Sequence, residues 1–289
     1  MPVILNNTLD GFGPLEPSNF IVNGQRLTTD VAGAVIGGTV MRTAQGASTI
    51  TLQLADPLRT ILRSGLFVYG SVLQVENLSF TAVQLTKSAD VLQLVFEASG
   101  VAALRLQTGV QATTNSVDLT GFVQSLVSAV PGLQLIAQST PLAAAVSIGR
   151  GTSNDVTEDS WTCIQRVVTS AGWRCFEVNG IIWLGPDSFF LSAPSQGTLV
   201  EFTPQIQNID FDYDIGKPFG TATVTGMCET WGYPPGAVVW TSGMGPMDGQ
   251  PWMVQDCQRD LYSPQMTATL HVPMSPYDVI NGVPTEAPF

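Results

Sequence analysis

The stretch Ser48-Thr-Ile-Thr-Leu-Gln-Leu54 decides the fold class of this chain. Apolar side chains stand at every second position from Ile50, and threonine or glutamine stands between them. Successive side chains of an extended strand point to opposite faces, so this alternation predicts a strand with one buried face. The chain therefore begins its regular structure as part of a β-sheet.

The same period of two recurs downstream, with polar breaks at Glu76-Asn77 and Lys87 to Asp90. The apolar positions that carry it are Leu73 and Val75, Leu78 and Phe80, Val83 and Leu85, and Leu92, Leu94 and Phe96. Several short strands at this spacing predict an antiparallel barrel or sandwich. Asp56-Pro57-Leu58 through Leu62 is expected to form one short helical turn, with proline at its start.

Near residue 118 the apolar period changes to that of a helix. Asp118 is the expected cap and Pro131-Gly132 the expected end of a helix with one apolar stripe, formed by Leu119, Phe122, Val123, Leu126 and Val130. A second helix is predicted over Glu158 to Ala171, capped by Thr157 and stopped by Gly172.

A hairpin follows the second helix, with strands at Trp173 to Val178 and Ile181 to Leu184. Asn179-Gly180 between them suits a two-residue type I′ turn, because both residues tolerate positive φ. The two helices and this hairpin together predict a small α/β insert.

The last part of the chain alternates again. The expected strands are Ile209 to Tyr213, Thr221 to Thr225, Ala237 to Trp240, Trp252 to Arg259 and Met266 to Val272. We therefore predict a mainly β protein with two antiparallel β-barrel domains and a small α/β insert. The expected division is 1–47, an amino-terminal arm with lead-in strands; 48–117, the first barrel; 118–187, the insert; 188–272, the second barrel; and 273–289, a carboxy-terminal arm.

The composition restricts the function classes. Only 12% of residues are charged and the net charge is −12, with 11 basic residues spread along the chain. This argues against a nucleic-acid-binding face, which needs clustered Lys and Arg. An acidic wall around a DNA conduit is compatible, since it repels phosphates. The apolar piece Val31 to Val40 is shorter than the roughly 20 residues needed to span a bilayer, and no secretory signal is expected.

No catalytic, cofactor or metal site is predicted. The single histidine, His271, is expected to be a solvent-facing strand residue, and no serine nucleophile motif accompanies it. Asp210, Asp212 and Asp214 start like a calcium loop, but Ile215 and Thr221 occupy the positions that need Gly and Glu. We interpret the three aspartates as the outer face of a strand.

Cysteines and tryptophans favour packing over chemistry. The four cysteines, Cys163, Cys175, Cys228 and Cys257, are expected as buried free thiols, with a disulfide between the last two left open. Trp161, Trp173 and Trp183 are expected in the core of the insert, and Trp231 at an interface. A carbohydrate-stacking role for the tryptophans is the alternative.

Three of these stretches resemble phage tail hub proteins. Thr157-Glu-Asp-Ser-Trp161 with the hairpin Phe176 to Leu184 is similar to their small insert domain, in which a Ser-Trp pair opens a helix. The run from Gly249 to Leu261, followed by Met266-Thr-Ala-Thr-Leu270, resembles their closing hairpin. The strand Ser48 to Leu54 with Asp56 is similar to their opening barrel strand, whereas residues 1–47 depart from the family pattern.

The resemblance implies a non-enzymatic baseplate or tail-tip hub protein in the virion, assembled in the host cytoplasm. It implies a trimer whose six barrels form a pseudo-sixfold ring around the DNA channel. The partners would be a distal tail or tube ring above and a tip or spike protein below, with no specific nucleic-acid binding and no membrane insertion. The alternatives are a carbohydrate-binding receptor or adhesion module and a cell-wall hydrolase subunit.

Overall fold

The computed structural model describes residues 15–107, 119–138, 158–193, 195–212, 220–228, 231–243, 248 and 251–272. It confirms the mainly β class. The amino-terminal half holds the short helices η1 (Pro17–Asn19), α1 (Thr29–Gly33) and α2 (Thr60–Ser64). Its strands are β1 (Ile21–Val22), β2 (Gln25–Arg26), β3 (Val35–Thr43), β4 (Thr49–Ala55), β5 (Val72–Val75), β6 (Leu78–Ser88) and β7 (Val91–Ala98).

The insert and the carboxy-terminal half follow along the chain. The insert comprises α3 (Ser99–Leu106), α4 (Leu119–Val127), β8 (Gln134–Ala137), α5 (Ser160–Ser170), β9 (Arg174–Val178), β10 (Ile181–Gly185) and α6 (Asp187–Leu191). The last strands are β11 (Thr198–Val200), β12 (Ile206–Asp212), β13 (Gly220–Met227), β14 (Val238–Ser242), β15 (Trp252–Asp260) and β16 (Gln265–Val272).

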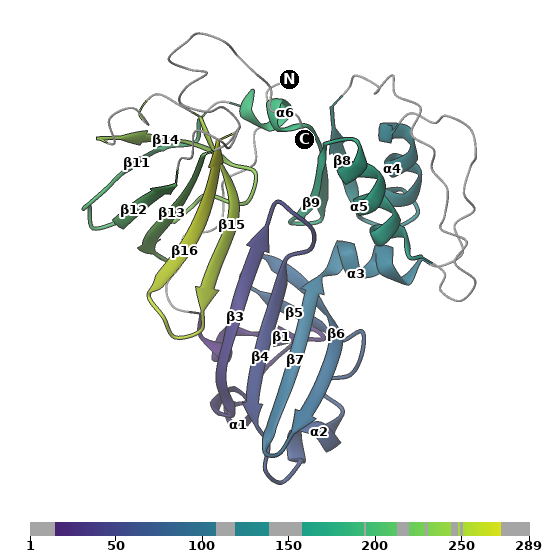
Figure 1. The fold of residues 1–289 in the computed structure, drawn as a ribbon. Helices are drawn as coiled ribbons and strands as arrows, with labels where there is room; N and C mark the ends of the chain where they lie inside the picture. Colours follow the sequence, from purple (N-terminus) through teal and green to yellow (C-terminus); the bar gives the residue numbers. More distant parts are fainter. Residues whose placement is uncertain are drawn as a thin grey trace.

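One antiparallel path of strands joins the two β halves. Its order is β12-β13-β16-β15-β3-β4-β7-β6-β5-β1-β2, and β14 with β11 branches from β15 (Figure 1). The link is the pairing of β15 with β3, from Asp256 opposite Thr43 to Asp260 opposite Thr39. The two closed barrels expected from the sequence are not seen among the described strands, because this link merges the halves into one open sheet.

Three buried clusters form the core. The amino-terminal cluster contains Leu52, Phe80 and Phe96, whereas the carboxy-terminal cluster contains Val224 and Trp252. The third cluster is that of the insert, where the apolar sides of α4 and α5 pack on the small sheet β8-β10-β9. In Figure 1 the insert stands as a separate lobe beside the long sheet.

Local patterns predicted several elements well. The stripe of α4 is buried from Leu119 to Leu126, while the expected cap Asp118 lies outside the described residues. The hairpin turn has φ 54° at Asn179 and 77° at Gly180, as a type I′ turn requires. The cap of α5 is Asp159, whose carboxylate accepts a hydrogen bond from Thr162 N at 2.8 Å, so the Thr157 cap was wrong.

The short helix after β4 begins later than expected, at Thr60. Asp56 explains the shift, because its carboxylate accepts hydrogen bonds from the N–H groups of Ile61 and Leu62, at 3.1 and 2.9 Å. The helix α3 and the strands β8 and β11 were not predicted. Each is short, and its apolar pattern is too brief to be distinguished from a loop.

Candidate functional site

One face of the long sheet is polar across six neighbouring strands. Because the strands are paired in register, the outward side chains of both halves form one surface. These side chains are Asn208, Asp210 and Asp212 on β12; Thr221, Thr223 and Thr225 on β13; Gln265, Thr267 and Thr269 on β16; Asp256, Gln258 and Asp260 on β15; Thr39 and Met41 on β3; and Thr49, Thr51 and Gln53 on β4. We call this surface the polar face. All its charged members are aspartates.

Short polar contacts hold the aspartates of the polar face. Thr39 Oγ1 donates to Asp260 Oδ1 at 2.8 Å, and Gln255 Nε2 donates to Asp256 Oδ2 at 3.1 Å. The arginines of the two central strands, Arg42 and Arg259, alternate to the opposite side, in register with core residues of the neighbouring strand. Apart from Met41, the polar face therefore presents hydroxyls, amides and negative charge.

A buried ionic cluster joins the insert to the carboxy-terminal half. Arg174 on β9 donates two hydrogen bonds to the carboxylate of Asp187 at the start of α6. His271 Nε2 on β16 lies 3.4 Å from Asp187 Oδ2. Burial by itself raises the pKa of Asp187, but the hydrogen bonds from His271 and Arg174 and their charge lower this pKa to about 2. The carboxylate is thus held ionised at the junction.

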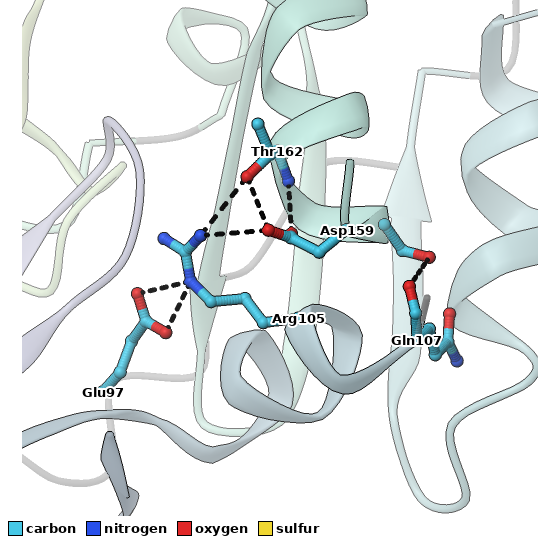
Figure 2. A network of polar contacts seen from close by, with 6 residues as sticks. Glu97, Arg105, Gln107, Asp159 and Thr162 are labelled. Carbon is cyan, nitrogen blue, oxygen red and sulfur yellow. Dashed lines mark hydrogen bonds and ion pairs between the residues drawn. The ribbon is translucent and has the colours of Figure 1, made fainter. Parts of the chain in front are cut away.

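A second polar joint ties the insert to the amino-terminal half (Figure 2). Arg105 Nε on α3 binds both carboxylate oxygens of Glu97 on β7, at 3.0 and 2.8 Å. Arg105 Nη1 also lies 3.6 Å from Asp159 Oδ2 and donates to Thr162 Oγ1 at 3.3 Å. One guanidinium therefore bridges a strand of the long sheet and the first turn of α5.

Glu177 places another buried carboxyl at the tip of the insert hairpin. Burial raises the pKa of Glu177, while a hydrogen bond from Gly180 N and the charge of Arg42 oppose that rise. Glu177 and Arg42 line a cleft of about 200 Å³ between the hairpin and the amino-terminal half of the long sheet. The hydrogen bond from Gly180 N to the Glu177 carboxylate closes the hairpin turn, so this carboxyl has a structural role.

Comparison with solved structures identifies the architecture. The tail protein of Neisseria meningitidis MC58 matches 88% of this chain and 95% of its own length, with 12% identity and a TM-score of 0.56. The 43 kDa tail protein of prophage MuSo2 from Shewanella oneidensis matches 90% and 97%, with 9% identity and a TM-score of 0.58. This chain has the fold of phage tail proteins.

The tail-protein fold extends to a secretion apparatus. A component of the type VI secretion system of E. coli, itself similar in structure to the T4 tail proteins gp27 and gp5, covers 87% of this chain at a TM-score of 0.60 and 12% identity; the match covers 76% of that protein. No family model matches the sequence, and no curated protein matches it. At such low identity the likeness is one of fold, and it confirms the resemblance to phage tail proteins that the sequence suggested.

The structure places His271 differently from the expectation. The sequence predicted a solvent-facing residue, whereas His271 is 8% exposed and contacts Asp187. His271 packs against the Asp187 carboxylate of the ionic cluster, and alternation along one strand cannot show such a contact. Sequence reasoning also missed Arg174 and Asp187, because no local spacing relates residues on β9, α6 and β16.

The aspartate triplet lies partly as expected. Asp210 and Asp212 are exposed on the outward face of β12, and Asp214 lies outside the described residues. Among the described residues, no three His, Cys, Asp or Glu side chains are grouped so as to hold a metal ion. No helix in the described ranges is long and apolar enough to cross a membrane.

The aromatic and sulfur side chains mostly pack. Trp161 lies in the insert core and Trp173 packs against it, but Trp183 belongs to the carboxy-terminal core, so its expected placement was wrong. Trp231 is buried within the chain and donates to the Tyr233 carbonyl at 3.0 Å, whereas an interface had been expected. All four cysteines are buried free thiols, as predicted.

Proposed function

We propose that this chain is a structural baseplate or tail-tip hub protein of a phage tail, without enzymatic activity. The observation that carries the proposal is the shared fold, which extends over most of this chain and most of several tail proteins. The proposed assembly is a trimer whose β halves alternate as a pseudo-sixfold ring. The proposed domain division is the one expected from the sequence, except that α3 belongs to the insert. Its partners would be the tail rings above and the tip or spike below.

The polar face supports a place around the DNA channel. Duplex DNA is densely charged, and proteins that hold it do so through Lys and Arg. The polar face instead offers uncharged hydroxyls and amides together with aspartates such as Asp256 and Asp260. Such a wall repels phosphate weakly and offers it no strong contact, so DNA would pass without adhering.

Assembly is tested by the mass of the purified chain in light scattering at several concentrations, with negative-stain images. A trimer with a central hole supports the hub proposal. A hexamer would indicate a tube or distal tail protein instead. A strict monomer would count against the ring and make a glycan titration the next measurement.

Passage of DNA is tested by reversing charge on the polar face. Asp256→Lys with Asp260→Lys should create measurable retention of duplex DNA at low salt, and the retention should disappear as salt rises. The matched control reverses Glu16 and Asp90, which are exposed elsewhere, by the same two charges. Equal retention by both pairs would contradict a special role for the polar face.

The carbohydrate-binding alternative has one supporting observation. Trp240 on β14 is partly exposed and stands opposite Thr198 of β11, the strand that also carries the exposed Val200. Aromatic faces of this kind stack on sugars. Titration with cell-wall glycans, comparing the wild type with Trp240→Ala, distinguishes this alternative from a purely structural role.

A further inference from the structure

The helix α2 and the strands β11 and β12 lie at opposite ends of the β structure (Figure 1). Exposed apolar side chains occur at both ends. The first group belongs to the segment 57–70 around α2. Leu58, Val68 and Tyr69 of this segment are 78%, 52% and 69% exposed. Exposing large apolar side chains to water is unfavourable in free energy. Binding a partner removes this apolar surface from water, so such groups often mark a contact surface.

The segment around α2 is rigidly built. The Asp56 carboxylate binds the N–H groups of Ile61 and Leu62. At the other end, Ser71 Oγ accepts a hydrogen bond from Val68 N at 3.0 Å and donates one to the Leu66 carbonyl at 3.3 Å. A surface fixed in this way loses little conformational entropy on binding, which favours a docking role.

The same segment carries exposed positive charge. Arg59 and Arg63 are both exposed, and neither forms an ion pair with a described residue. Asp56 lies beside them, but its carboxylate binds the helix N–H groups. Together with Leu58, Val68 and Tyr69, the two arginines make up what we call the α2 surface. It is basic within a chain whose net charge is −12.

The second group lies at the corner between β11 and β12 and on β14, which pairs with β11. Val200, Phe202 and Trp240 are 43%, 83% and 36% exposed. Glu201 Oε1 accepts a hydrogen bond from Ile209 N at 3.0 Å, which holds this corner against β12. The exposed Asp210 and Asp212 follow on β12, which is the last strand of the path and therefore forms the edge of the polar face.

We call Val200, Phe202, Trp240, Asp210 and Asp212 the β12 corner. It is apolar and acidic where the α2 surface is apolar and basic. The two surfaces are therefore both apolar and have charges of opposite sign. Opposite charges around apolar side chains favour one docking register and disfavour others.

We propose that the α2 surface of one copy binds the β12 corner of a second copy, head to tail. Two different surfaces at opposite ends make a heterologous contact, and such a contact closes into a ring when its rotation permits. The apolar side chains supply the affinity, and the arginines and aspartates fix the register. The inference rests on the proposed ring and names its contact surfaces.

Charge reversal tests the contact by sedimentation velocity over a concentration series. Arg59→Glu with Arg63→Glu, and separately Asp210→Arg with Asp212→Arg, should each weaken association at least tenfold. The variant that carries all four changes restores the opposite charges, so its assembly should return. Circular dichroism verifies that each variant is folded. Arg26→Glu, at an exposed arginine on β2, is a control that reverses a single charge outside both surfaces and should leave association unchanged.

Different results would contradict the proposed contact and the proposed hub function. If the wild type forms rings and the Arg59 and Arg63 variant forms them equally well, the contact lies elsewhere and the hub proposal stands. Loss of association that the four-change variant does not regain would also overturn the pairing of these two surfaces. A wild type that is monomeric at every concentration would overturn both the contact and the ring.

Discussion

Replacing Asp187 by Asn should destabilise the joint between the insert and the carboxy-terminal half. The substitution keeps the shape of the side chain but removes the negative charge that faces Arg174 and His271. The pKa of Asp187 is lowered from 3.8 to about 2, and each pKa unit corresponds to about 1.4 kcal/mol. The charge of this carboxylate therefore contributes about 2 kcal/mol at neutral pH.

The measured loss should be larger, about 3–5 kcal/mol, because the variant also leaves the buried Arg174 guanidinium without its counter-charge. Urea unfolding followed by tryptophan fluorescence gives the free energy of unfolding. The control is Glu158→Gln, which breaks a 2.9 Å ion pair with Arg166, whose side chain is 44% exposed. Because the Arg166 side chain is largely open to solvent, this partly exposed pair should contribute about 1 kcal/mol or less.

The pH dependence provides the sharper test. A carboxyl with a lowered folded-state pKa stabilises the protein fully above its unfolded pKa of about 3.9 and loses that contribution as the pH falls toward the folded value. The difference between wild type and Asp187→Asn should therefore shrink between about pH 4 and pH 2. A difference that stays constant across this window, or a loss equal to that of Glu158→Gln, would refute the reasoning.

Three further predictions follow from the packing. Trp161→Ala should cost about 3–5 kcal/mol and unfold the insert, because this side chain fills the insert core; an unchanged melting profile would contradict that placement. Gly180→Ala should cost about 1 kcal/mol, because Gly180 has φ 77°, whereas Gly33→Ala, at a site with ordinary φ and open space, should not destabilise the fold. A thiol reagent should label the cysteines only in denaturant, since all four are buried; rapid labelling of the native chain would show otherwise.

Local sequence patterns predicted those parts of the fold in which neighbours along the chain also meet in space. The alternation from Ser48 gave β4, and the helical stripe from Leu119 gave α4. The turn at Asn179-Gly180 was predictable because its backbone angles suit few other residues. The polar face was implicit in the same alternation, but its continuity over both halves was not.

Long-range pairing was decided only by the tertiary structure. β15 and β3 lie more than two hundred residues apart in sequence, and their pairing merges two expected barrels into one sheet. Arg174, Asp187 and His271 come from three separate elements, so no spacing could bring them together in advance. His271 was misplaced for the same reason, because alternation on β16 does not show what packs against that strand.

The sequence by itself determined the class of the elements, their approximate order and the scarcity of positive charge, because side-chain periodicity and composition are properties of the chain alone. The tertiary structure decided which strands pair, which carboxylates are buried and which apolar side chains stay exposed at opposite ends. Those depend on contacts between distant segments, and the free energy of such contacts is set by the packed arrangement and not by any one stretch of residues.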